Sequence, residues 1–368
     1  MKKARVLAAL SGGVDSSVAA LLLQRQGYEV VGAFLRNGVA APEPSCGPHH
    51  GCCSAEDARD AALVADSLGI PFHSLDMAEE FTGIQDYFAA EYGDGRTPNP
   101  CAVCNRDVKF GALARIADAV GADFLATGHY AQTRLEGGRA QLFRGRDAHK
   151  DQSYVLFSIG EEVLARTLLP VGDLDKDRTR ALAAEAGLRV AAKPDSQEIC
   201  FVPTGDYRDV LRGRGGLGEP GRFLDAAGRE LGRHDGYMGF TRGQRRGLGI
   251  SHHEPLYVLD ILPESGDVIV GPREAVGCLE VEVSGFTTYG CDLAEGERWE
   301  DVEVQYRSSP GGEAAAVEGR GGQRALIRFT DPAESVNPGQ GLAVYRGRRM
   351  LGGGWIERAS FSGVRLPV

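Results

Sequence analysis

The sequence predicts an α/β protein in three parts: a domain built on a parallel sheet (residues 1–203), a small loop-rich module (204–277) and a C-terminal antiparallel β-barrel (278–368). The first part alternates short apolar runs with helical patterns, which is typical of a parallel sheet. The second part opens with many Gly and Arg residues and little periodicity, and the third has short β-like runs between turn residues. A chain of 368 residues is long enough for two or three domains of about 100–200 residues.

The elements of the first part follow from apolar spacing. A helix is expected where Val18, Leu21 and Leu22 recur on one face, and the hydroxyl of Ser54 can cap the helix after it. The expected strands are 5–10, 30–35, 72–75 and 124–127, and the expected helices are 16–26, 55–68, 110–120 and 176–186. In the last two parts, Gly, Pro and Asp separate the β-like runs. These expected strands are 257–261, 268–270, 279–283, 302–306, 325–329, 342–345 and 354–357.

The net charge of −10 argues against a uniformly basic surface, but residues 204–250 hold nine Arg against six acids. Contact with phosphate needs local positive potential rather than a positive total. The chain has no run of about 18 apolar residues and no signal-peptide pattern, so we expect a cytoplasmic protein without a membrane partner. The eight cysteines are then expected to be reduced thiols, metal ligands or catalytic groups.

A glycine-rich loop, LSGGVDSS at residues 10–17, joins the first strand to the first helix. Its glycines let the backbone approach an anion, and the helix N-terminus supplies N–H groups and partial positive charge. The loop lacks the Lys of a Walker loop. It resembles the loop of the PP-loop ATP pyrophosphatases, which implies that ATP is cleaved at its α phosphate into an adenylate and pyrophosphate. Asp15 is expected to associate with Mg²⁺, which takes carboxylate and phosphate oxygens.

A second segment, residues 97–105, carries Cys101 and Cys104 among prolines that restrict the backbone. Such a fixed approach suits a catalytic thiol better than core filling, and a nearby helix N-terminus favours the thiolate. A third cysteine, Cys200, comes as the first part ends.

Together these motifs resemble those of the MnmA-type tRNA-specific 2-thiouridylases, in the same order from residue 5 to about 357. The motifs are the PP-loop, TPNPCxxCN, ATGHY, KDQSY, SQEICF and GQRRGLGI, followed by LGGG. The resemblance implies that the wobble uridine of tRNAs for Glu, Gln and Lys is adenylated at O2, and that sulfur then replaces this oxygen. By the same resemblance, the residues that contact ATP are Ala9, Leu10, Ser11, Gly12, Gly13, Val14, Asp15, Ser16, Leu35 and Gly128. Leu35 can equally be a core residue.

The resemblance also gives the catalytic set Asp15, Cys104 and Cys200. Cys200 matches the cysteine that carries a persulfide, loaded by a sulfur-relay protein or a cysteine desulfurase. Its terminal sulfur attacks C2 of the base, or leaves as sulfide that attacks. Cys104 matches the partner thiol that can close a disulfide with Cys200.

Cys101 stands where many relatives have Asp, which opens two alternatives. Cys101, Cys104 and Cys200 can hold three irons of a [4Fe–4S] cluster whose fourth iron binds sulfide. C-x-x-C is also half of a structural zinc site. A further group combines three cysteines with two histidines at no standard spacing, and is either a metal site or a loop that closes over ATP. It consists of Cys46, His49, His50, Cys52 and Cys53.

Positions that match the family's tRNA contacts are Asn99, Pro100, Cys101, His129, Lys150, Asp151, Gln152, Tyr306, Arg307 and Gln340. Lys and Arg suit phosphates, whereas Tyr, Gln and Asp suit splayed bases. A wobble base must leave the anticodon stack to react, and residues 99–101 are candidates for the wall of its pocket. Arg242, Arg245 and Arg246 form a candidate phosphate patch, with a solvated turn as the alternative.

Three other functions compete with this hypothesis. A PP-loop synthetase acting on a small molecule would need neither the cysteines nor the basic module. A PP-loop enzyme that aminates tRNA would not depend on Cys104 and Cys200. A non-catalytic RNA-binding protein would not need the intact loop.

Overall fold

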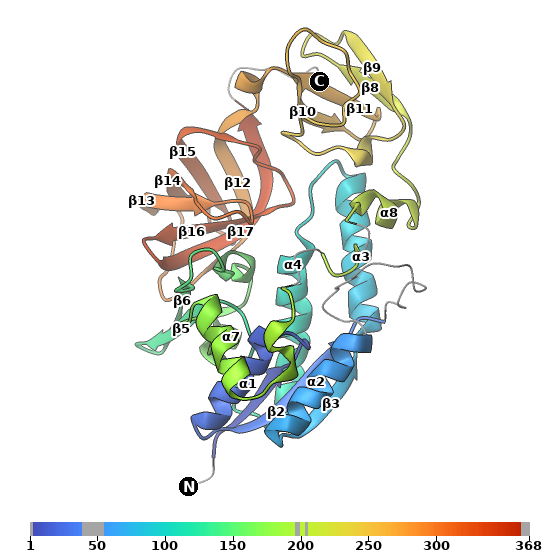
Figure 1. Cartoon of the computed structure of the whole chain (residues 1–368). Coiled ribbons are helices and arrows are strands. Elements are labelled where there is room, and N and C mark those ends of the chain that lie inside the picture. Colours follow the sequence, from blue (N-terminus) through green and yellow to red (C-terminus); the bar gives the residue numbers. More distant parts are fainter. Residues whose placement is uncertain (1–2, 39–54, 196–198, 203–204, 362–368) are drawn as a thin grey trace.

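The computed structural model describes residues 3–38, 55–195, 199–202 and 205–361. Figure 1 shows three parts, with the α/β domain at one end, the barrel beside it and a smaller β module at the other end. Within these described ranges, no helix has the length and apolar character needed to cross a bilayer.

The first sheet has the strand order β3-β2-β1-β4-β7, and every pairing in it is parallel. The strands are β1 (Arg5–Ala9), β2 (Glu29–Arg36), β3 (Phe72–Asp76), β4 (Phe124–Ala126) and β7 (Thr167–Leu168). The middle of β1 is fully buried, with Val6, Leu7 and Ala8 at 0–1% exposure. This is expected of a parallel strand covered on both faces. The predicted α/β domain is confirmed.

Helices cover this sheet and connect it to the other parts (Figure 1). The α-helices are α1 (Val14–Arg25), α2 (Ala55–Leu68), α3 (Ala78–Gly93), α4 (Pro100–Val103), α5 (Leu113–Ala119), α6 (Glu161–Ala165), α7 (Lys176–Glu185) and α8 (Tyr207–Arg212). The 3-10 helices are η2 (Ser153–Leu156), η3 (Arg189–Ala192), η4 (Tyr237–Gly239) and η5 (Arg273–Ala275). Helix α3 was not predicted, although its buried residues Phe81, Ile84 and Phe88 recur at helical spacing.

The helix predicted for 110–120 has a different form. It begins earlier, as the π-helix η1 (Cys104–Ala112), and continues as α5. A Cβ on Gly111 would lie 2.8 Å from the carbonyl oxygen of Arg106, one π-turn earlier, so glycine suits this wide turn. π-Turns are rare and are frequent at functional sites, and this one starts at a predicted catalytic cysteine.

The middle module is a four-stranded sheet with the order β10-β11-β8-β9. Its strands are β8 (Gly221–Leu224), β9 (Glu230–His234), β10 (Tyr257–Leu262) and β11 (Asp267–Gly271). The hairpin of β8 and β9 lies in the segment that was expected to be loops. Both strands are short and carry Gly and Arg, so their alternation is too brief to recognise.

The C-terminal barrel is confirmed. Its order is β12-β15-β14-β13-β16-β17, and pairing between β12 and β17 closes it. The strands are β12 (Gly277–Thr288), β13 (Arg298–Gln305), β14 (Glu313–Gly319), β15 (Ala325–Glu334), β16 (Gly341–Arg346) and β17 (Arg349–Phe361). Strand β14 was not predicted, because its EAAAVEG sequence has low β propensity.

A hairpin of the α/β domain extends the sheet of the barrel. It comprises β5 (Ala131–Glu136) and β6 (Arg139–Arg144), and β6 pairs with β17. The α/β domain and the barrel also share an apolar cluster, to which the α/β domain contributes Phe110 and Phe157 and the barrel contributes Tyr345. The barrel is therefore docked on the α/β domain through a common core.

Candidate functional site

The glycine-rich loop ends at the start of α1. Gly13 is the N-cap, with φ −100° and ψ 166°, and no side chain caps the helix there. The first N–H groups of α1 are thus directed at a site that suits an anion. The hydroxyls of Ser16 and Ser17 donate to the Gly13 carbonyl at 3.2 and 2.8 Å, and Ser11 Oγ lies 3.1 Å from Ser16 Oγ. The loop is held in one conformation by its own hydroxyls.

Gly12 and Gly128 stand where a larger residue does not fit. Gly12 has φ +74°, and a Cβ there would lie 2.3 Å from the carbonyl oxygen of Asp57. A Cβ on Gly128 would lie 2.5 Å from the backbone nitrogen of Ser16. Because Gly128 comes just after β4, the carboxyl end of that strand touches the loop.

The other predicted ATP contacts lie at the same edge of the sheet. Ala9 ends β1, and Leu10 and Val14 are 2% and 3% exposed. Leu35, in β2, is 8% exposed and packs in the α/β core, so its core role is observed. Its contact with adenine stays a prediction.

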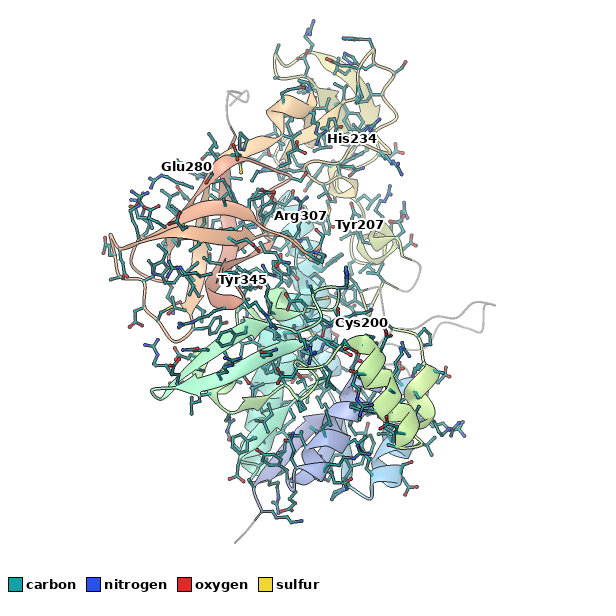
Figure 2. The ribbon with its side chains drawn as sticks, turned by 60° about the vertical axis from the view of Figure 1, so that its left-hand side comes forward. Cys200, Tyr207, His234, Glu280, Arg307 and Tyr345 are labelled. Carbon is teal, nitrogen blue, oxygen red and sulfur yellow. The ribbon has the colours of Figure 1, made fainter. Side chains whose placement is uncertain are left out.

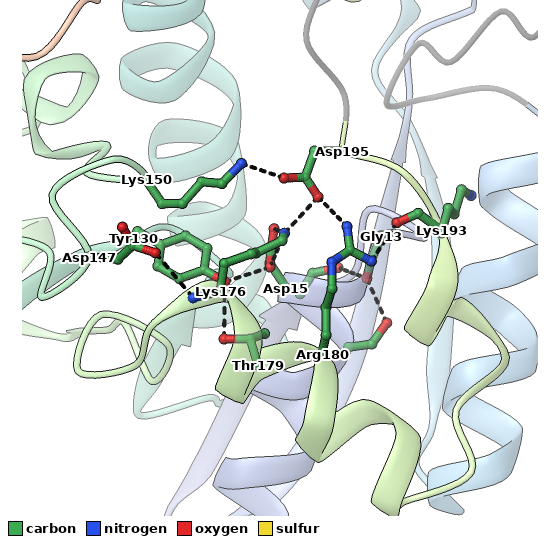
Figure 3. A network of polar contacts seen from close by, with 12 residues as sticks. Gly13, Asp15, Tyr130, Asp147, Lys150, Lys176, Thr179, Arg180, Lys193 and Asp195 are labelled. Carbon is green, nitrogen blue, oxygen red and sulfur yellow. Dashed lines mark hydrogen bonds and ion pairs between the residues drawn. The ribbon is translucent and has the colours of Figure 1, made fainter.

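Asp15 lies in a network of ion pairs (Figure 3). Its two carboxylate oxygens accept from Lys176 Nζ at 2.7 and 2.8 Å, and the hydroxyl of Tyr130 donates to it at 2.8 Å. Lys176 is 8% exposed and also pairs with Asp195 at 2.8 Å. Burial and the neighbouring Asp15 raise the pKa of Tyr130, so this phenol stays protonated.

Asp195 forms ion pairs with three cationic side chains. Lys150, Lys176 and Arg180 lie 2.6, 2.8 and 2.8 Å from its carboxylate (Figure 3). Burial acts to raise its pKa, but the hydrogen bonds from Lys150 and Lys176 prevail and lower the pKa of Asp195 to about 2. Lys150, predicted to contact tRNA, is therefore engaged in this network.

Lys193 holds the other side of the loop. Its Nζ donates to the Gly12 carbonyl at 3.0 Å and to Asp57 and Asp60 at 2.7 and 2.6 Å. Lys176 and Lys193 were not predicted as site residues, because their contacts with Asp15, Gly12 and Asp60 join positions 133–181 residues apart in sequence. Tyr130 and Asp195 lay within or beside recognised motifs, which was a usable signal.

The cysteine-bearing turn is fixed by Asn99. Its side chain accepts from the Ala102 N–H at 3.1 Å and so caps α4, with Pro100 in the first turn. Cys101 is exposed, whereas Cys104 is 8% exposed at the start of η1.

Cys104 and Cys200 are associated with the same apolar cluster. Cys104 belongs to the apolar cluster of the α/β domain, and Cys200 packs against the same cluster. Figure 2 shows Cys200 on the side of the α/β domain that faces the other two parts. The structure thus brings the two predicted catalytic thiols to one region, although they are far apart in sequence.

Gln340 reaches from the barrel to the cysteine-bearing turn. Its Nε2 donates to the carbonyls of Pro98 and Thr97 at 2.7 and 3.3 Å, and its Oε1 accepts from Asn99 at 3.4 Å. The resemblance implied a tRNA contact for Gln340. In the structure this side chain holds the proline-rich segment, and its contact with tRNA stays a prediction.

Asp151 organises the turn around it. Its carboxylate accepts from the N–H groups of Gly145 and Ser153 at 2.9 and 3.1 Å, and 8% of its side chain is exposed. The contact of Asp151 with tRNA stays a prediction. Gln152 is exposed, although its Oε1 accepts from the Tyr130 N–H at 2.9 Å.

Tyr306 lies in the barrel core. Its ring is 3% exposed and packs edge-on against Phe329, and its hydroxyl donates to the Glu334 carbonyl at 3.3 Å. The contact of Tyr306 with tRNA stays a prediction. Arg307 is exposed, with its guanidinium 5.2 Å from the Tyr306 ring centroid (Figure 2). Its phosphate contact stays a prediction.

Arg242 does not belong to a surface patch. It pairs with Asp260, 16% of its side chain is exposed, and burial lowers its pKa. Arg245 and Arg246 are exposed.

His129 is also buried, with Nδ1 2.8 Å from Thr127 Oγ1. The predicted cluster of Cys46, His49, His50, Cys52 and Cys53 lies outside the described residues.

Asp15 offers one carboxylate beside the anion site, and a carboxylate with phosphate oxygens is a set that Mg²⁺ accepts. Both oxygens face Lys176, so Asp15 suits Mg²⁺ once this lysine moves. Cys101 and Cys104 are three residues apart on one helical turn and share a face. This placement is compatible with both the persulfide and the cluster hypotheses.

The comparisons with known proteins cover most of the chain. Family models match residues 4–204 (tRNA methyl transferase HUP domain), 209–272 (tRNA methyl transferase PRC-barrel domain) and 288–356 (Aminomethyltransferase beta-barrel domain). The tRNA-specific 2-thiouridylase MnmA of Carboxydothermus hydrogenoformans is 44% identical over 96% of this chain and 98% of its own. The protein of the same name from Acidithiobacillus ferrooxidans is 45% identical over 97% and 99%.

The chain belongs to the tRNA-specific 2-thiouridylase MnmA family. The family models are described in terms of methyl transferases, whereas the full-length relatives are named 2-thiouridylases. A solved 4-thiouridine synthetase–RNA complex with bound ATP is more distant, with 21% identity over 54% of this chain and 45% of that one, and a TM-score of 0.37.

Proposed function

We propose that this protein is an ATP-dependent tRNA-uridine 2-sulfurtransferase that acts on the wobble uridine of tRNAs for Glu, Gln and Lys. The observation that carries the proposal is the packing of Cys104 and Cys200 against one apolar cluster. An adenylating enzyme of another kind would need the loop but not this pair of thiols. The full-length relatives, named tRNA-specific 2-thiouridylases, support the same reaction.

In the first step, the loop and the N-terminus of α1 hold the terminal phosphates of ATP. The O2 atom of the flipped uracil attacks the α phosphate, and pyrophosphate leaves. Mg²⁺, when bound, offsets phosphate charge, and Asp15 is the residue that would hold it. Asn99 and Pro100 form part of the wall that orients the base.

In the second step, the terminal sulfur of a Cys200 persulfide attacks C2 of the activated base, and AMP leaves. The thiolate of Cys104 then attacks Cys200 Sγ and breaks the S–S bond to the base. This gives 2-thiouridine and a Cys104–Cys200 disulfide. An external thiol reductant must reduce the disulfide, and a sulfur-relay protein or cysteine desulfurase must reload Cys200.

The test is thiolation of unmodified glutamate tRNA by iron-free enzyme supplied with Mg²⁺, ATP, a persulfide donor and a reductant. We expect thionucleoside, AMP and pyrophosphate from the wild type. Cys200→Ala should keep pyrophosphate release but lose thiolation by about a hundredfold or more. Cys291→Ala, which removes a half-buried barrel thiol, is the matched control and should keep both activities.

The outcomes separate the hypotheses. Thiolation by Cys200→Ala would exclude the persulfide on this residue. Activity that appears only after anaerobic iron and sulfide reconstitution would keep the function and replace the persulfide with a [4Fe–4S] cluster. Pyrophosphate exchange without tRNA, together with no thiolation, would favour a small-molecule synthetase.

A further inference from the structure

Lys176 is a buried cation beside the anion-binding end of α1. Its side chain is 10% exposed, and its Nζ lies within 2.8 Å of both Asp15 oxygens and of Asp195. Asp15 lies in the first turn of α1, whose N-cap carries no side-chain hydrogen bond. The ammonium group therefore stands next to the site that the loop presents to an anion (Figure 3).

The charges around the loop are balanced without a nucleotide. Among the described residues of this network, four cations pair with four carboxylates. They are Lys150, Lys176, Arg180 and Lys193, with Asp15, Asp57, Asp60 and Asp195. A bound polyphosphate adds several negative charges in a partly buried place, so some cation must turn toward it.

Lys176 is the cation whose movement leaves its partners best satisfied. Asp195 keeps Lys150 and Arg180, and Asp15 keeps the hydroxyl of Tyr130. Lys193, in contrast, is bound to a loop carbonyl and to two acids. A lysine side chain also has the flexible stem and three donors that such an exchange needs.

We infer that Lys176 binds the terminal phosphates of ATP, exchanging Asp15 and Asp195 for phosphate oxygens. It thereby supplies, from helix α7, the positive charge that the loop sequence lacks. The exchange also frees both oxygens of Asp15 for Mg²⁺. This inference rests on the proposed use of ATP at the loop.

The experiment compares Lys176→Met, which keeps the length but removes the charge, with Arg178→Met. Arg178 is on the same helix, is half exposed and pairs with Glu185. Calorimetric titration without tRNA measures affinity for a non-hydrolysable ATP analogue, pyrophosphate and AMP. In Lys176→Met, affinity for the analogue and pyrophosphate should fall about tenfold or more, and that for AMP less than about twofold. Arg178→Met should leave all three unchanged.

If Lys176→Met loses affinity equally for AMP and pyrophosphate, or loses none at all, the role of Lys176 in phosphate binding is overturned. If the wild type itself fails to bind the analogue, the proposed function fails instead. Loss of a buried charge can also unfold a chain. The second measurement therefore uses ¹⁵N-lysine NMR of the wild type, with the Lys176 Nζ signal assigned from its absence in Lys176→Arg. That signal should shift with pyrophosphate and not with AMP, and no shift with pyrophosphate would contradict the inference.

Discussion

At the scale of single residues, Gly128 determines how closely β4 approaches the ATP loop. Gly128→Ala would place a Cβ 2.5 Å from the Ser16 nitrogen, so the loop or the strand must move. Overpacking of this kind costs about 1–3 kcal/mol. We expect affinity for an ATP analogue to fall about tenfold, measured by calorimetry.

Gly160→Ala is the control for this prediction. Gly160 begins α6, and a Cβ there meets no atom within 4 Å. The Gly160→Ala variant should bind the ATP analogue as the wild type does. Wild-type affinity in Gly128→Ala would show that this contact does not shape the site.

Residues whose partners are close in sequence were predictable, and the others were not. The loop from Leu10 to Ser17 stood out because its glycines and hydroxyls act on neighbouring backbone atoms. Lys176 gave no signal in the sequence, because its role depends on ion pairs with Asp15 and Asp195 that form only in the folded structure. The burial of Tyr306 in the barrel was not predicted either, because a match to a family position carries no information on burial.

At the scale of elements, Gln340 ties the barrel to the cysteine-bearing turn. Gln340→Met keeps the length but removes the donor to the Pro98 and Thr97 carbonyls. Because Cys101 and Cys104 follow this segment directly, we expect slower thiolation with tRNA affinity changed less than about twofold. Single-turnover thiolation and tRNA titration measure the two quantities.

The same experiment separates two roles of Gln340. A direct tRNA contact would instead weaken tRNA binding and leave the single-turnover rate at saturating tRNA unchanged. Arg307→Met is the comparison variant, because the resemblance implies a tRNA contact for Arg307 and this side chain is exposed. It should weaken tRNA binding without slowing saturated turnover.

Element types were predictable where periodicity was long, and failed where geometry was unusual. The helix 55–68 was predicted with its observed bounds because it has many turns of regular spacing. The π-helix η1 was not, since no sequence periodicity distinguishes it from an α-helix over nine residues. The hairpin β5–β6 was not predicted, although the Gly137-Gly138 turn between its strands is a local hairpin signal. Its pairing with β17, about two hundred residues further on, gives no local signal.

At the scale of the whole molecule, the barrel and the α/β domain share a core that no domain boundary in the sequence suggested. Tyr289 is 0% exposed at this junction, and its hydroxyl lies 2.8–3.0 Å from the carbonyls of Leu156, Phe157 and Ile159. The barrel therefore depends on this polar contact as well as on apolar packing. A shared core predicts that the two parts unfold together.

Tyr289→Phe tests this prediction because it removes only the hydroxyl. A buried carbonyl left without a hydrogen-bond donor lowers the free energy of unfolding by about 1–3 kcal/mol, and here this loss destabilises the junction between the two parts. We expect the wild type to melt in one calorimetric transition and Tyr289→Phe to melt earlier, with the barrel separating as a distinct first transition. Tyr306→Phe removes a hydroxyl that bonds only within the barrel, to Glu334, and should lower the midpoint without splitting it. Two transitions in the wild type would show instead that the parts fold independently, and that the sheet pairing of β6 with β17 contributes little to joining them.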